Sequence, residues 1–95
     1  MSFINLIKKL REEQQMPQRQ LAVALNIDTA TYCKIEKGDR RAKREQVETI
    51  AFVLNADKNV LLSQWLADQL LITLADDKAV AQMALEIAQQ TLKQK

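Results

Sequence analysis

Glycine and proline are almost absent from this sequence, which has one of each in 95 residues. A sheet protein of this size needs many tight turns, and those turns favour Gly, Pro and Asn. Apolar residues make up 47% of the chain and charged residues 27%, a balance that suits packed helices. We therefore predict an all-α protein, a compact bundle of five or six helices around a single core.

Apolar residues recur with helical spacing along most of the chain. The spacing predicts helices over about residues 3–14, 17–25, 29–37 and 44–54, and two more within residues 56–95. Pro17 favours the start of the second helix, Asn26 its left-handed end, and Gly38 the end of the third. Asp76 and Asp77 are the expected caps of the last helix. A membrane-surface helix is the alternative for the first segment, but the other segments supply apolar faces that cover it.

The cysteine and histidine content excludes several kinds of site. Cys33 is the only cysteine and histidine is absent, so neither an intrachain disulfide nor a Cys-His metal set is available. The N-terminal apolar run is interrupted by Lys8 and Lys9, and no stretch is long enough to span a bilayer. We predict a cytoplasmic protein without a metal, cofactor, small-molecule ligand or membrane partner. It is not expected to be an enzyme, because no acid–base pair, phosphate loop or activated nucleophile can be named.

Positive charge is concentrated in the first part of the chain. Residues 1–55 carry ten Lys and Arg against seven Asp and Glu, whereas residues 56–95 carry four against five. Much of the excess lies in residues 37–44, which contain five bases and one acid around Gly38. Such a run is either an ordinary solvated loop or a positively charged surface that binds phosphates.

Two short helices joined by a tight turn have the geometry that lays the second helix in the major groove of DNA. The residues Leu21-Ala22, Asn26-Ile27-Asp28 and Lys34-Ile35-Glu36-Lys37-Gly38 resemble the signature of the phage repressor, Cro and XRE-type helix-turn-helix regulators. The resemblance runs from about Ile4 to Leu54. It implies a lambda-repressor-like DNA-binding domain over residues 1–55, with residues 56–95 as a C-terminal helical extension in the same compact unit.

The resemblance also assigns roles to single residues. It makes residues 29–37 the recognition helix, with the base-reading positions at Thr29, Ala30 and Lys34. The positions implied to contact the DNA backbone are Gln18, Thr31, Arg40, Arg41, Lys43 and Arg44. Arg11 and Glu36 match a structural pair that links the first helix to the recognition helix. An ammonium in the major groove pairs well with O6 and N7 of guanine, so Lys34 is the most informative position. The alternative for Lys34 is an ordinary surface lysine or a phosphate contact.

Some positions depart from the family pattern. Pro17 stands where a Ser, Thr or Asn cap is common, and Asn26 replaces the usual turn glycine. Ala42-Lys43 replaces a common Pro-Ser before the fourth helix, which leaves the path of the basic loop open. Cys33 is interpreted as a chance small residue near the groove edge, with a redox sensor as the alternative.

Residues 56–95 contain more apolar side chains than one narrow helical stripe requires. The resemblance implies that such C-terminal helices dimerise, and the residues expected to do so are Trp65, Leu66, Leu70, Ile72, Val80, Met83 and Ile87. A monomeric core closed by a helical hairpin is the alternative. A twofold homodimer would bind a pseudo-palindromic operator.

These expectations define one function and one rival. We predict a sequence-specific regulator of transcription whose partners are double-stranded DNA and a second copy of the chain. The rival is a protein-interaction module, such as an antitoxin or a coactivator-like adaptor, built on the same fold. Strong salt dependence of DNA binding would favour the regulator.

Overall fold

A computed structural model describes residues 2–94 of the chain, and this part contains six α-helices and no strand. The helices are α1 (Phe3–Glu13), α2 (Gln18–Leu25), α3 (Thr29–Lys37), α4 (Arg44–Val53), α5 (Lys58–Leu74) and α6 (Lys78–Lys93). The predicted all-α class is confirmed, and the first four helices begin and end within one residue of their expected limits. Within residues 2–94, no helix combines the length and the apolar character needed to cross a membrane.

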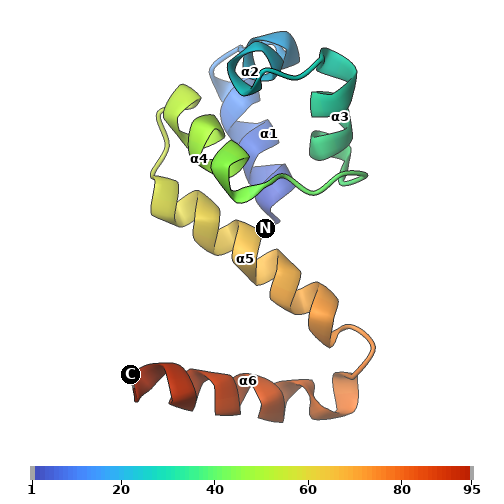
Figure 1. Cartoon of the computed structure of the whole chain (residues 1–95), viewed down its shortest axis with the longest axis vertical. Coiled ribbons are helices and arrows are strands. Elements are labelled where there is room, and N and C mark those ends of the chain that lie inside the picture. The colour runs from blue at the N-terminus through green and yellow to red at the C-terminus, as the bar shows by residue number, and fades with distance from the viewer. Residues whose placement is uncertain (1, 95) are drawn as a thin grey trace.

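Helices α1 to α5 enclose the hydrophobic core (Figure 1). Helix α4 packs against α2 and α5, α1 packs against α3 and α5, and α2 packs against α3. Each of the five helices therefore contacts two others. The largest fully buried side chains are Ile7, Leu21, Tyr32, Ile35, Val47, Ile50, Leu54 and Leu61. Since these residues come from all five helices, the core fixes the orientation of the helix pair α2–α3.

The turn between α2 and α3 and the end of α3 are set by local chemistry. Asn26 ends α2 in the left-handed region with φ 58°, as the sequence predicts. The Asp28 carboxylate caps α3 by accepting a hydrogen bond of 2.7 Å from the Thr31 amide. Gly38 ends α3 with φ 86°, and an added Cβ there would lie 3.3 Å from Cδ1 of Ile4. Both backbone geometry and close packing therefore favour glycine at this position.

The predicted side-chain cap of α6 is not formed. Asp77 occupies the position before the helix, but its side chain accepts no capping hydrogen bond. Its backbone has φ −127° and ψ 44°, outside the extended conformation that directs a capping carboxylate to the first free amides. The start of α6 is thus less firmly fixed than the start of α3.

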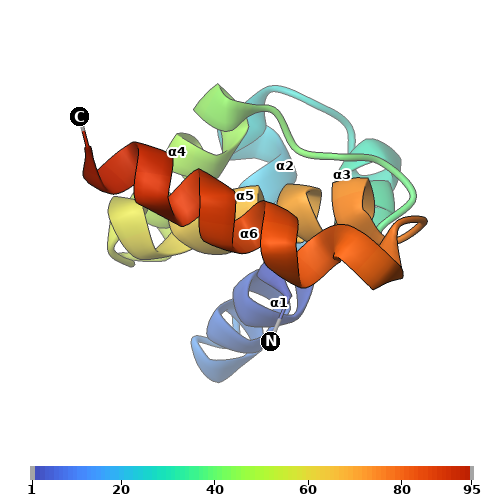
Figure 2. The same cartoon turned by 90° about the horizontal axis from the view of Figure 1, so that it is seen from below.

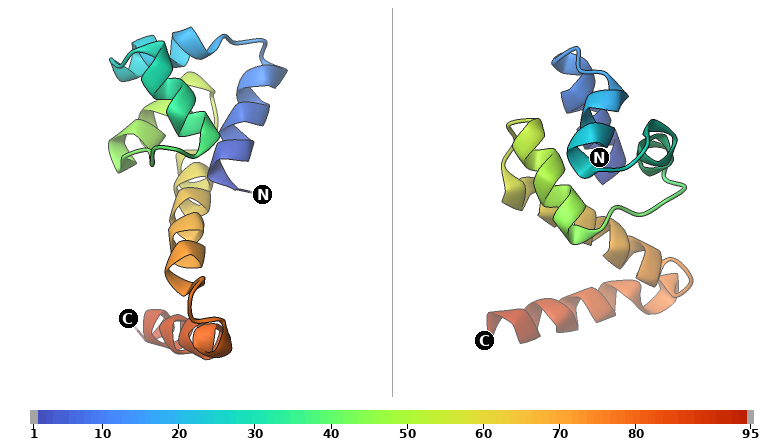
Figure 3. Two further views of the ribbon diagram at one scale, coloured as in Figure 1. Left: turned by 90° about the vertical axis from the view of Figure 1, so that its right-hand side faces the viewer. Right: turned by 45° about the horizontal axis from the view of Figure 1, so that its top comes forward.

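Helix α6 lies across the end of the molecule that is farthest from α2 (Figures 1 and 3). Viewed from that end, α6 crosses in front of α5 (Figure 2). None of its residues is buried. The radius of gyration is 15.3 Å, whereas a compact protein of this length has about 12 Å. The core is thus formed by α1–α5. Helix α6 extends away from this core and is mostly exposed to solvent.

Candidate nucleic-acid interface

Helix α3 has one face in the core and one face in solvent. Tyr32, Ile35 and Glu36 are buried against the rest of the molecule. Thr29, Ala30 and Lys34, the expected base-reading residues, are exposed on the other side, and Thr31 is half-buried. Figure 3 shows α3 on the outside of the molecule along its length. The inner face of α3 is therefore fixed by packing and the outer face is exposed to solvent. A helix that binds in a DNA groove needs this arrangement.

A hydrogen-bonded network around the Glu36 carboxylate holds α3 in place. Arg11 of α1 donates from Nε to Glu36 Oε2 at 2.8 Å and from Nη2 to Oε1 at 3.1 Å. Its third nitrogen, Nη1, donates to the Met16 carbonyl at 2.8 Å. The Tyr32 hydroxyl donates to Oε2 of the same carboxylate. Arg11 thus joins α1 to α3 through one bidentate contact and to the following loop through a third hydrogen bond.

The protonation states of this network differ from those of exposed side chains. Burial alone would raise the pKa of Glu36, but hydrogen bonds from Arg11, Tyr32 and Gln18 outweigh it and lower the pKa. Burial and the Glu36 carboxylate both raise the pKa of Tyr32. At neutral pH the carboxylate is therefore charged and the phenol protonated, which is the combination that the hydrogen bonds require.

We expect the protein to lose stability as the pH falls below about 4.5, the ordinary value for a glutamate. The pKa of Glu36 is lowered in the folded chain, so its stabilising effect is present above that pH and lost below it. Urea unfolding between pH 3 and 7 measures the loss. The variant Glu36→Gln should flatten the profile, whereas Glu13→Gln, at an exposed position of α1, should leave it unchanged. Equal flattening by both variants would contradict the assignment.

The basic loop between α3 and α4 is held at both ends. Its start turns back onto α3 because the Asp39 and Arg40 amides both donate to the Lys34 carbonyl, at 2.9 and 3.3 Å. Its end is fixed by the Lys43 amide, which donates to Gln46 Oε1 at 2.9 Å. Ala42 is buried between these points. Four basic side chains of this segment are exposed, namely Arg40, Arg41, Lys43 and Arg44.

This geometry agrees with a comparison of the sequence with known families. A family model described as helix-turn-helix matches residues 7–61, more than half of the chain. The chain belongs to the XRE-type helix-turn-helix family. Membership indicates a DNA-binding transcription regulator, and the family is not typically enzymatic. The curated proteins and the solved structures gave no significant match.

Gln18, the first residue of the helix-turn-helix pair, points toward the interior. Its Nε2 donates to Glu36 Oε1 at 3.0 Å, and its Oε1 accepts a hydrogen bond of 2.9 Å from the Cys33 thiol. The side chain expected to hold a phosphate is thus engaged in the Glu36 network. Cys33, expected on the outward face, is half-buried because it packs toward Gln18 on α2. No periodic pattern in the sequence indicates these two contacts.

Trp65 contacts the basic loop of this helix-turn-helix protein, although the sequence groups it with the dimerisation residues. Its indole nitrogen donates to the Ala42 carbonyl at 2.8 Å. The Arg41 guanidinium carbon lies 4.1 Å from the ring centroid. A partly buried indole needs an acceptor for its N–H, and the loop carbonyl provides one. This side chain is thus engaged within the protomer, and its expected place in a dimer surface stays a prediction.

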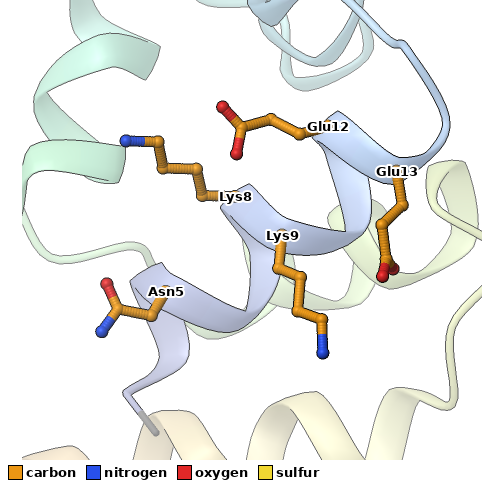
Figure 4. Close-up of a pocket in the computed structure, with 5 residues that line it drawn as sticks. All are labelled: Asn5, Lys8, Lys9, Glu12 and Glu13. Carbon is orange, nitrogen blue, oxygen red and sulfur yellow. The ribbon is translucent and has the colours of Figure 1, made fainter.

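The outer side of α1 borders a shallow, open hollow whose lining carries both positive and negative side chains. Figure 4 shows its lining residues, Asn5, Lys8, Lys9, Glu12 and Glu13, as side chains that project from the helix. All five are exposed. Two adjacent lysines are followed about one turn later by two adjacent glutamates, so this side lacks the excess of positive charge found in the basic loop.

Proposed function

We propose that the protein is a sequence-specific regulator that binds its operator as a twofold homodimer, with α3 in the major groove. The observation that carries this proposal is the exposed polar face of α3 beside a basic loop, held on a frame that the buried Arg11–Glu36 pair fixes. Side chains that read base edges must be presented at a defined angle. A helix whose buried face is fixed to the rest of the protein meets that requirement.

Within this proposal, bases and phosphates are contacted by different residues. Thr29, Ala30 and Lys34 face the base edges, because they lie on the exposed face of α3. Thr31 lies at the edge of that face. Arg40, Arg41, Lys43 and Arg44 are the proposed phosphate ligands, and their charges act on any DNA sequence. Because the Gln18 amide is engaged inside, a phosphate at the start of α2 would be bound by backbone amides and the exposed Arg19.

We expect Lys34→Ala and Arg40→Ala to have different signatures. Loss of the Lys34 ammonium should relax specificity at one base pair by about 1 to 3 kcal/mol. Loss of Arg40 should weaken operator and unrelated DNA alike and lower the salt slope by about one. Competition binding at several salt concentrations measures both effects. Lys9→Ala, on the outer side of α1 (Figure 4), is the matched lysine control. Equal effects of both variants on every sequence would contradict the division of roles.

The proposed dimer surface is the α5–α6 apolar face, which we define as Leu66, Leu70, Ile72, Val80, Met83 and Ile87. Each of these side chains is about half exposed or more, with fractions from 49% to 66%. The exposed area of the chain is 6873 Å², whereas a compact protein of 10.9 kDa exposes about 5,600 Å². The excess is roughly 1,300 Å² and exceeds the area of about 800 Å² that each partner buries in a standard interface.

Selection from random DNA duplexes tests the proposed function directly. The purified protein is expected to enrich an inverted repeat whose half-sites lie about one helical turn apart. Enrichment without an inverted repeat would support base reading but contradict the twofold dimer. Weak, salt-sensitive retention with no enrichment would contradict specific reading and favour a protein-interaction module.

A further inference from the structure

We propose that Trp65 is a positioning residue for DNA binding, which sets the conformation of the basic loop without touching DNA. This inference rests on the proposed function, because it takes Arg41 as a phosphate ligand. Through Trp65, helix α5 would serve two purposes, since its C-terminal half also carries part of the α5–α6 apolar face.

Two contacts from one side chain reach adjacent residues of the loop. The hydrogen bond from Nε1 to the Ala42 carbonyl fixes the backbone at 2.8 Å. The indole face lies against the Arg41 guanidinium, 4.1 Å from the ring centroid. A cation over an aromatic face is attracted by the ring quadrupole. Trp65 therefore restrains both the loop backbone and the charged group that would meet the phosphate.

On the side that faces α5, the loop is supported at the buried Ala42 and is otherwise bordered by open space. A cavity of about 250 Å³ lies there, and its lining includes Phe3, Ile4, Gly38, Arg40, Arg41 and Trp65. Because the space behind the loop is not filled by close-packed side chains, packing alone does not determine where Arg41 lies. The indole forms one wall of this cavity and makes the specific contacts described above.

Restraint of Arg41 matters because a free arginine loses conformational freedom when it binds a phosphate. Long, flexible side chains have the largest rotamer entropy to lose. A guanidinium that is already held near its bound position loses less, so its contact with the phosphate is stronger. The contact between the guanidinium and the ring is not a hydrogen bond, so it leaves the N–H donors of Arg41 available to bind an anion.

DNA affinity and salt dependence test this role in the full-length protein. We expect Trp65→Leu to weaken binding to operator and unrelated DNA by about 3- to 10-fold. The salt slope should fall by less than it does in Arg41→Ala, because the Arg41 charge remains. Because Trp65 acts through Arg41, the double variant Trp65→Leu/Arg41→Ala should bind no more weakly than Arg41→Ala alone. Trp65→Phe keeps an aromatic face without the N–H donor and should bind with intermediate affinity.

Controls separate this role from folding, dimerisation and the proposed function. Ser63→Ala, at an exposed position of α5, should leave affinity unchanged, and sedimentation should show one oligomeric state for all variants. Trp65 is the only tryptophan in the chain, so its fluorescence should respond to Arg41→Ala more than to Arg40→Ala. The inference is overturned if the wild type binds DNA and Trp65→Leu matches it, or if its loss adds fully to that of Arg41→Ala. A wild type that binds no DNA overturns the proposed function itself.

Discussion

Replacing Arg11 by alanine is expected to lower the free energy of unfolding by about 3 to 5 kcal/mol, the range for breaking one side of a buried ion pair. The Arg11 side chain is 11% exposed and that of Glu36 is 3% exposed, so the remaining carboxylate would stay buried without its cation. The Met16 carbonyl would lose its donor as well. For a chain of this size, such a loss is a large part of a total stability of about 5 to 10 kcal/mol.

Thermal and urea unfolding of purified variants measure this effect. A loss of that size should lower the midpoint temperature by more than about 10 °C. Arg19→Ala is the matched control, since Arg19 is an exposed arginine of α2 and should change stability by less than about 0.5 kcal/mol. The double variant Arg11→Met/Glu36→Leu should recover part of the loss, because it removes the buried charge together with its partner. Equal destabilisation by Arg11→Ala and Arg19→Ala would show that the pair is not a structural link.

The pattern of the sequence predicts what repeats along a helix or depends on a local backbone preference. Apolar spacing is enough to place the first four helices, and the left-handed ends at Asn26 and Gly38 follow from residues that tolerate positive φ. The Arg11–Glu36 contact is implied by a family resemblance, because nothing in its separation of 25 positions indicates a contact.

Side-chain contacts between distant helices are what the sequence does not predict. Trp65 and Ala42 are 23 positions apart, and the Phe3 amide donates to an Asp68 carboxylate oxygen 65 positions away, at 2.7 Å. Such pairs depend on how helices cross, not on the periodicity of either one. Spacing did hold one useful signal, since Leu61, Trp65 and Asp68 follow the i, i+4, i+7 spacing that places Trp65 on the inner side of α5.

The variant Ile87→Asp is expected to convert the proposed dimer into a monomer and to lower affinity for a palindromic operator by about 100-fold or more. Ile87 is 61% exposed in the single chain, and a carboxylate there would be buried without a partner in the α5–α6 interface. A dimer that contacts both half-sites binds about 10² to 10⁴ times more tightly than a single protomer on one half-site. A monomeric variant should lose roughly this gain in affinity.

Helix α6 offers a matched control for this change. Ala81 and Leu85 line a hollow with Leu71 and Leu74 of α5, which fixes the side of α6 that faces its own chain. Gln89 is exposed and lies opposite Ile87 on the helix, so Gln89→Asp adds the same charge outside the apolar face.

Sedimentation at several protein concentrations and binding to whole and half operators distinguish the outcomes. Gln89→Asp should sediment like the wild type, whereas Ile87→Asp should sediment near the chain mass of 10.9 kDa. Affinity for a single half-site should be the same for all three proteins, because α3 and the basic loop lie far from α6 (Figure 1). A wild type that is monomeric and binds whole and half operators equally would rule out the twofold dimer. The same apolar face would then serve a different protein partner, because an exposed surface of this size is seldom left uncovered.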